Sequence, residues 1–120
     1  MTKVAILGFG TVGSGVAEVL SKNSQGIARR SGGEIQVKYI LDVRDFPDSP
    51  FKDCFVKDFS IIENDPEVEV VVETIGGAKV ALEFTTRALK AGKSVVSSNK
   101  ELVATHGYEL LQLAREHGVS

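Results

Sequence analysis

Three glycines near the N-terminus have the spacing of a phosphate-binding turn. Gly8, Gly10 and Gly13 form a Gly-x-Gly-x-x-Gly pattern directly after an apolar run at residues 4–7 and directly before a stretch with helical periodicity. The first glycine of such a pattern permits a tight turn, the second lets the backbone approach a pyrophosphate, and the third lets helix and strand pack closely. The helix N-terminus adds unpaired N–H groups and about half a positive charge. The pattern predicts a dinucleotide-binding turn.

Asp42 and Arg44 follow the second apolar segment and bear on the choice of cofactor. In a dinucleotide-binding fold, an acidic residue here binds the ribose 2′-hydroxyl of NAD, whereas an arginine accommodates the 2′-phosphate of NADP. Strand alternation places both side chains on one face, with Arg44 nearer the open edge. We therefore expect NADP or NAD as cofactor, with NADP favoured. A solvated arginine in a surface turn is the alternative interpretation.

Two further polar segments follow later apolar runs. Residues 73–77, Glu-Thr-Ile-Gly-Gly, and residues 97–100, Ser-Ser-Asn-Lys, each come at the end of a predicted strand. Open α/β sheets bind ligands at the carboxyl ends of their strands, so both segments are expected at the same edge. Serine hydroxyls can hold a nicotinamide carboxamide, and Lys100 can polarise or protonate a carbonyl oxygen. A flexible turn before a helix and a solvated lysine remain the alternatives.

The elements that position these residues alternate between strand and helix. Strands are expected at residues 4–7, 35–43, 54–56, 69–74 and 94–97, and helices at residues 11–29, 58–62, 79–90 and 105–116. In the second strand, Ile35, Val37, Tyr39, Leu41 and Val43 should share one face. The alternation predicts an α/β fold with a Rossmann-type doubly wound parallel sheet, formed by one domain at residues 1–120. Residues 118–120 look like the start of another strand, so we expect the domain to be incomplete.

Composition excludes several other classes of protein. The 120 residues are 42% hydrophobic and 25% charged, which is typical of a globular domain, and a net charge of −2 gives no case for binding nucleic acid or an anionic membrane. The apolar run at the N-terminus stops at glycine after four residues, unlike a signal peptide. Cys54 is the single cysteine, which suits a reducing cytosol. Neither His106 nor His117 has the spacing of a metal site.

Three motifs in register carry a resemblance to a known family. They are Gly-Phe-Gly-Thr-Val-Gly-Ser-Gly-Val at residues 8–16, Glu-Thr-Ile-Gly-Gly at residues 73–77, and Ser-Asn-Lys-Glu-Leu-Val-Ala at residues 98–104. With these motifs the chain closely resembles the cofactor-binding part of homoserine dehydrogenase. The resemblance implies NAD(P)-dependent interconversion of aspartate 4-semialdehyde and homoserine, on the route to threonine, methionine and isoleucine. It also implies a cytoplasmic enzyme that acts on a small molecule and is a homo-oligomer at full length.

The resemblance also implies roles for individual residues. The matches to the pyrophosphate turn are Gly8, Phe9, Gly10, Thr11, Val12 and Gly13. Thr74 and Gly76 match the cofactor-facing strand end, and Ser97 and Ser98 match the nicotinamide side. Lys100 matches the family's active-site lysine, which would protonate the oxygen as hydride reaches the aldehyde carbon. Ser98 replaces a more usual alanine, and Asp42 is less typical, which leaves the choice between NAD and NADP open.

A substrate domain carries the family's second lysine and its acidic homoserine-binding residues. Because that domain would lie beyond residue 120, we expect this chain to bind cofactor without turnover. Two other functions remain open: a related two-domain oxidoreductase, which usually has Glu-Lys-Pro where this chain has Asn99-Lys100-Glu101, and a non-catalytic nucleotide-sensing module.

Overall fold

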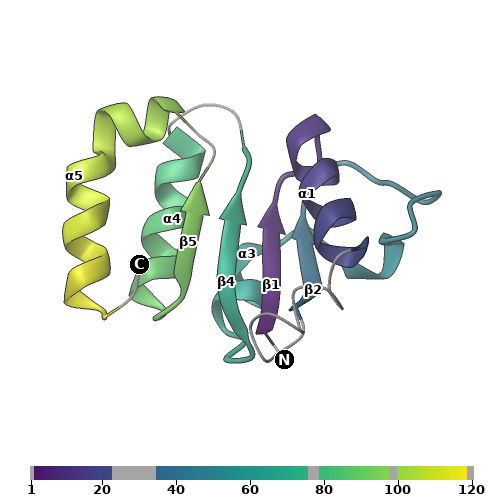
Figure 1. Ribbon diagram of the computed structural model, residues 1–120, viewed down its shortest axis with the longest axis horizontal. Coiled ribbons are helices and arrows are strands. Elements are labelled where there is room, and N and C mark those ends of the chain that lie inside the picture. Colours follow the sequence, from purple (N-terminus) through teal and green to yellow (C-terminus); the bar gives the residue numbers. More distant parts are fainter. Residues whose placement is uncertain (1, 23–34, 76–78, 98–99, 119–120) are drawn as a thin grey trace.

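The computed structural model describes residues 2–22, 35–75, 79–97 and 100–118. In the described residues, five parallel strands form one sheet in the order β3-β2-β1-β4-β5, and the arrowheads of β1, β4 and β5 point to the upper edge in Figure 1. The strands are β1 (Thr2–Leu7), β2 (Ile35–Leu41), β3 (Phe55–Val56), β4 (Val68–Glu73) and β5 (Ser94–Ser97). The helices are α1 (Thr11–Lys22), the 3-10 helix η1 (Lys52–Cys54), α3 (Phe59–Glu63), α4 (Lys79–Lys90) and α5 (Lys100–Glu116). This order confirms the predicted Rossmann-type sheet.

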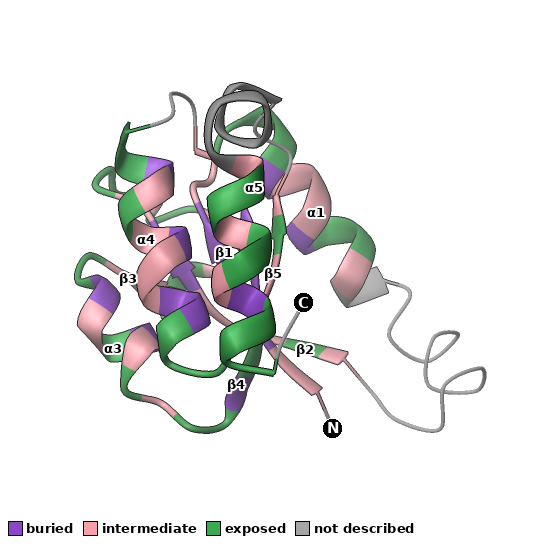
Figure 2. Ribbon diagram, turned by 90° about the vertical axis from the view of Figure 1, so that its left-hand side faces the viewer, coloured by how far each residue is buried: buried purple, intermediate pink, exposed green. Residues whose placement is uncertain are grey.

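Helices lie on both faces of the sheet, and the two faces bury separate clusters. Figure 2 shows α1 on one side of the sheet and α3 and α4 on the other, with α5 beside α4. Under α3 and α4 the buried cluster includes Leu7, Leu41, Phe59 and Val71. On the α1 face a smaller cluster consists of Ile6, Ala17 and Ile40. Burial on both faces explains why the central strands are continuous apolar runs.

The pairing of β1 with β2 contains an irregularity that the sequence pattern did not predict. Val4 pairs with Val37, but the next residue, Ala5, pairs with Tyr39, so β2 carries one extra residue. An extra residue shifts the alternation of side chains by one position. Val37 accordingly packs with the α1-side cluster, whereas Tyr39 packs with the α4-side cluster. The prediction that Val37 and Tyr39 share one face is therefore wrong.

The second strand also ends two residues earlier than predicted. β2 stops at Leu41, and Val43 is 84% exposed. The Asp42 side chain accepts a hydrogen bond from the backbone N–H of Arg44 at 2.9 Å. Aspartate side chains that accept from the backbone two residues on favour turns over strands. The chain thus leaves the sheet at the position where the predicted cofactor-selecting residues begin.

Most other elements confirm their predicted positions within one or two residues. Asp58 caps α3 by accepting from the Ser60 N–H at 2.9 Å, as predicted. The last helix differs, because α5 begins at Lys100 rather than after a cap at Thr105. Residues 100–104, Lys-Glu-Leu-Val-Ala, include four good helix formers, which favour the earlier start. The predicted extension of the first helix to residue 29 lies outside the described residues.

Candidate functional site

The glycine turn joins the carboxyl end of β1 to the N-terminus of α1. Gly8 has a φ of +93°, a conformation that residues with a side chain rarely adopt, and its N–H donates to the Leu41 carbonyl at 2.7 Å. The Ser14 N–H donates to the Gly10 carbonyl at 2.9 Å in the first turn of α1. The amides that precede Ser14 have no acceptor within a helix of this geometry. They face the edge of the sheet where an anion can bind.

Gly13 and Gly10 are needed for opposite reasons. A Cβ atom on Gly13 would lie 2.0 Å from the Gly8 carbonyl oxygen and 2.9 Å from the Thr74 hydroxyl oxygen, so only glycine fits between helix and strand. A Cβ atom on Gly10 would meet nothing within 4 Å. The surface above Gly10 is therefore open, as close approach of a ligand to the backbone requires.

Thr74 fastens the turn to the neighbouring strand. Its hydroxyl donates toward the carbonyl oxygens of Leu7 at 2.8 Å and Gly8 at 3.1 Å, and its backbone N–H donates to the Leu7 carbonyl at 2.9 Å. The sequence predicts Thr74 as a cofactor-facing residue. The geometry gives its hydroxyl a positioning role in the turn, although the residue also lines the cavity described below.

Asp42 connects the glycine turn to Arg44. One carboxylate oxygen of Asp42 accepts from the Phe9 N–H and from Arg44 Nη2, both at 2.9 Å, and the other accepts from Arg44 Nε at 3.1 Å. The hydrogen bonds from the Arg44 side chain, aided by the backbone N–H groups of Arg44 and Phe9, lower the pKa of Asp42 to about 2. The Asp42 side chain is 7% exposed and that of Arg44 is 60% exposed. The buried Asp42 carboxylate therefore holds the Arg44 guanidinium in place while the guanidinium stays exposed to solvent.

A cavity of about 460 Å³ lies at the carboxyl ends of β1, β2 and β4. Its lining consists of Gly8, Phe9, Gly10, Leu41, Asp42, Val43, Arg44, Lys57, Thr74, Ile75, Val80 and Phe84. Six residues predicted from the sequence thus come together here: Gly8, Phe9, Gly10, Asp42, Arg44 and Thr74. The volume is in the range of small-molecule sites, and the mixture of apolar walls with a few polar groups is typical of them.

Lys57 is a cation of this cavity that the sequence analysis missed. It follows β3, a strand of two residues that pairs in parallel with the end of β2. Its ammonium lies 2.8 Å from the Asp45 carboxylate, and both side chains are more than half exposed. A short strand was expected near residues 54–56. If that strand had also been predicted to pair in parallel with the second strand, Lys57 would have been placed at the same sheet edge as Asp42 and Arg44.

The remaining predicted residues lie in the first turn of α1, at the end of β5, at the start of α5 or outside the described part. Thr11, Val12 and Gly13 form the first turn of α1. Ser97 ends β5, and its hydroxyl donates to the Glu73 carboxyl group at 2.7 Å. Lys100 is the first residue of α5, but its side chain is not described. Gly76 and Ser98 lie outside the described residues.

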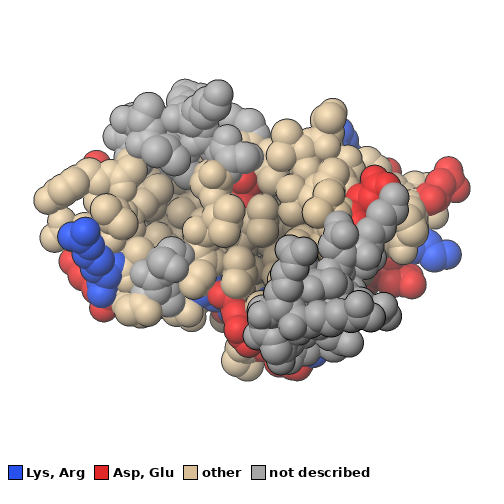
Figure 3. Space-filling view, in the orientation of Figure 1, with Lys and Arg blue, Asp and Glu red and all other residues tan. Residues whose placement is uncertain are grey.

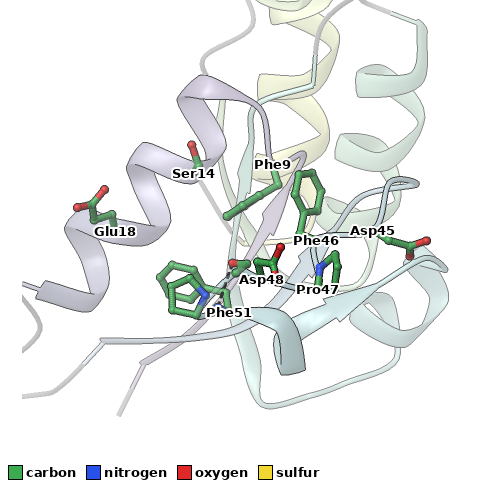
Figure 4. A pocket seen from close by; sticks show the side chains of 10 residues that line it. Phe9, Ser14, Glu18, Asp45, Phe46, Pro47, Asp48 and Phe51 are labelled. Carbon is green, nitrogen blue, oxygen red and sulfur yellow. Dashed lines mark hydrogen bonds between the residues drawn. The ribbon is translucent and has the colours of Figure 1, made fainter.

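A second, larger cavity of about 810 Å³ lies between α1 and residues 45–51. Figure 4 shows Ser14 and Glu18 on α1 and the rings of Phe9, Phe46 and Phe51 across from them. Phe9 packs edge-to-face against Phe46, with ring centroids 5.0 Å apart. This packing braces the loop after β2 against the glycine turn.

The surface and the other candidate groups can be examined over the part of the chain that the structure describes. In Figure 3 the charged side chains of the described residues lie mainly around the margins of the face. Within the described ranges, no three His, Cys, Asp or Glu side chains are grouped as a metal site. None of the helices in the described part combines the length and apolar composition needed to cross a membrane. Burial, followed by the charge of Asp53, raises the pKa of the Cys54 thiol, as expected for a packed cysteine rather than a nucleophile.

The chain is similar to proteins of a known enzyme family. Residues 8–120 match the family model described as the NAD-binding domain of homoserine dehydrogenase. The homoserine dehydrogenase of Pseudomonas aeruginosa is 44% identical over 119 residues, which cover 98% of this chain and 27% of that protein. The structure of S. aureus homoserine dehydrogenase superposes with a TM-score of 0.90 at 34% identity, covering 99% of this chain and 31% of that one. For the Thiobacillus denitrificans homoserine dehydrogenase the TM-score is 0.86 at 36% identity, with coverage of 98% and 28%.

Proposed function

Because the chain belongs to the homoserine dehydrogenase family, we propose that residues 1–120 are an NAD(P)-binding domain whose cavity beside Gly10 and Arg44 holds the adenosine half of the cofactor. The observation that carries the proposal is the glycine turn, in which Gly13 fits where no side chain can and the space above Gly10 is open. The N-terminus of α1 binds the pyrophosphate. The proposed roles of the turn residues are those that the sequence predicts for Gly8, Phe9, Gly10, Thr11, Val12 and Gly13.

NADP is the favoured cofactor. Arg44 and Lys57 line the same cavity, and both are more than half exposed, so two cations are accessible to a 2′-phosphate. Both carboxylate oxygens of Asp42 already accept from Phe9 or Arg44. A ribose hydroxyl of NAD would have to compete with these donors. Asp42 therefore acts mainly by positioning Arg44.

The activity of the whole protein is the NAD(P)-dependent interconversion of aspartate 4-semialdehyde and homoserine, in the synthesis of threonine, methionine and isoleucine. The chain spans about 27% of the length of the first curated relative it matches. The bound cofactor supplies or accepts the hydride. In this proposal Lys100 donates the proton to the carbonyl oxygen, Ser97 and Ser98 orient the nicotinamide side, and Gly76 lets it approach the backbone. The full protein is a cytoplasmic homo-oligomer.

Calorimetric titration of the purified chain with NADP and NAD at fixed salt tests the cofactor proposal. We expect NADP to bind about tenfold more tightly than NAD, since charge-assisted contacts to a phosphate have this order of strength. Arg44→Ala should remove this preference and leave NAD affinity nearly unchanged. Lys57→Ala should reduce the preference for NADP in part. Lys52→Ala, an exposed lysine of η1 that does not line the cavity, is the control. Equal losses for both nucleotides in Arg44→Ala would contradict the assignment.

A further inference from the structure

Glu73 is a buried carboxyl group at the edge of the sheet where the cofactor is proposed to bind. It is the last residue of β4, and 0% of its surface is exposed. In the sheet register it pairs with Leu7 on β1 and with Ser97 on β5. A carboxylate in such a position is costly to desolvate unless hydrogen bonds compensate. The Glu73 carboxyl group is therefore expected to accept hydrogen bonds from neighbouring segments.

The two oxygens of Glu73 accept from two different segments. One accepts from the Ser97 hydroxyl at 2.7 Å, and the other accepts from the backbone N–H of Ile75. Ile75 is part of the wall of the 460 Å³ cavity, whereas Ser97 ends the next strand. The carboxyl group therefore joins the chain leaving β4 to the end of β5.

The hydrogen bonds of Glu73 with Ser97 and Ile75 lie on the side of the sheet edge where one half of the dinucleotide is expected. Arg44, at the end of β2, marks the adenosine half on the other side of β1. A dinucleotide crosses the sheet edge where the strand order reverses, between β1 and β4. Its nicotinamide half then lies over the ends of β4 and β5, where Glu73 and Ser97 meet.

We infer that Glu73 is a positioning residue for the nicotinamide half of the cofactor, acting through the Ser97 hydroxyl and the backbone at Ile75. This inference rests on the proposed function. A buried charged group is a weak source of stability compared with an apolar side chain of similar size. Its advantage here is geometric, since it fixes two segments that are 22 residues apart in sequence, Ile75 and Ser97, relative to one another.

A pair of ligands separates this role from a general structural role. NADP and 2′-phospho-ADP-ribose share the adenosine, 2′-phosphate and pyrophosphate, and only NADP carries nicotinamide. In the wild-type chain we expect calorimetry to give tighter binding of NADP. Glu73→Gln keeps the shape of the side chain but replaces one acceptor oxygen with an NH2 donor, so the side chain can no longer accept from both Ile75 and Ser97. It should reduce NADP affinity about tenfold and change the affinity for 2′-phospho-ADP-ribose less than about twofold.

Two further variants keep the result interpretable. Ser97→Ala removes the donor from the other side and should cause the same selective loss, with little added effect in the double variant because the residues act as one unit. Glu69→Gln makes the same chemical change at an exposed position of β4 and should leave both affinities unchanged. Thermal unfolding of each variant reports whether the fold is retained.

The outcomes distinguish this inference from the proposed function. Equal losses of both ligands in Glu73→Gln, or wild-type affinities that do not differ, would overturn the role of Glu73 and leave cofactor binding intact. If the wild-type chain bound neither ligand, the proposed function and this inference would fail together. Selective loss of NADP affinity in Glu73→Gln and Ser97→Ala would establish the role.

Discussion

At the carboxyl ends of the strands the polar groups surround an open cavity, whereas at the amino end of β4 they bind one another. Around the cavity, Arg44 is 60% exposed on its buried partner Asp42, and the space above Gly10 is open. Around the turn at residues 64–67, which leads into β4, Asp65 accepts from Lys38 and from the Tyr39 hydroxyl. In the proposed function the carboxyl end receives the ligand, whereas the polar groups at the amino end close the fold.

Lys93 shows the contrast most clearly. It is 3% exposed, and its ammonium donates to the backbone carbonyls of Asp65 at 2.7 Å and Val68 at 2.8 Å. Burial lowers the pKa of Lys93, and the charge of Asp65 acts in the opposite direction. At the amino end, the buried Lys93 ammonium thus donates hydrogen bonds to backbone carbonyls in and just after the turn before β4. At the carboxyl end the space above Gly10 and the Arg44 side chain remain open to solvent.

If this comparison is correct, changes at the carboxyl end should affect ligand binding and changes at the amino end should affect stability alone. Gly13→Ala is the exception that affects both, and it has the largest expected effect. Its Cβ atom would overlap the Gly8 carbonyl, which cannot move without breaking the turn. We expect a loss of about 3 kcal/mol or more in the free energy of unfolding and no measurable binding of NADP.

Gly15→Ala is the matched control for Gly13→Ala, because it makes the same change two residues later in α1. A Cβ atom on Gly15 would meet nothing within 4 Å. Alanine in a helix interior is favoured over glycine by about 1 kcal/mol, so this variant should be slightly more stable. Denaturant unfolding measures both variants, and similar destabilisation of the two would contradict the packing argument.

Lys93→Met tests the amino end. It keeps the length of the side chain and removes both hydrogen bonds from the ammonium to the Asp65 and Val68 carbonyls, so that the Asp65 carbonyl keeps only the 3.2 Å bond from the Val68 N–H. We expect a loss of about 2 kcal/mol in the free energy of unfolding and an unchanged affinity for NADP by calorimetry. Lys90→Met, at an exposed position in the last turn of α4, should change stability by no more than about 0.5 kcal/mol. A fall in NADP affinity in Lys93→Met would break the division between the two ends.

The residues that could be predicted from the sequence are those whose constraint is local. Gly8, Gly10 and Gly13 follow from the backbone requirements of a single turn, and Asp42 and Arg44 follow from their place after a strand. This part of the site lies within one strand–turn–helix unit and one strand end, so each piece can be predicted from a short segment of sequence. The cavity lining confirms that these segments meet.

The residues that were missed depend on pairing between distant segments. The extra residue in β2 is visible only when Val37 and Tyr39 are aligned against Val4 and Ala5. Lys57 reaches the site only because β3 joins the sheet in parallel. The bond between Glu73 and Ser97 needs the register of β4 against β5. Periodicity within one segment contains none of this information.

The pH dependence of stability in Asp42→Asn and Asp65→Asn compares a carboxylate at each end of the sheet. This comparison has the smallest expected effect. The pKa of Asp42 is lowered to about 2, so its ionised form stabilises the fold above about pH 4, and this contribution is lost as the pH falls toward 2. Between pH 5 and 3 the stability difference between wild type and Asp42→Asn should shrink by at most about 1 kcal/mol in denaturant unfolding.

Hydrogen bonds from Lys38 and Tyr39 hold the pKa of Asp65 further below its usual range, so the stability difference between wild type and Asp65→Asn should persist to lower pH. Other carboxylates are common to each pair of proteins and cancel. A difference that grows on acidification would contradict the ion pair of Asp42 with Arg44, whereas an earlier loss for Asp65→Asn would contradict the tighter pairing at the amino end.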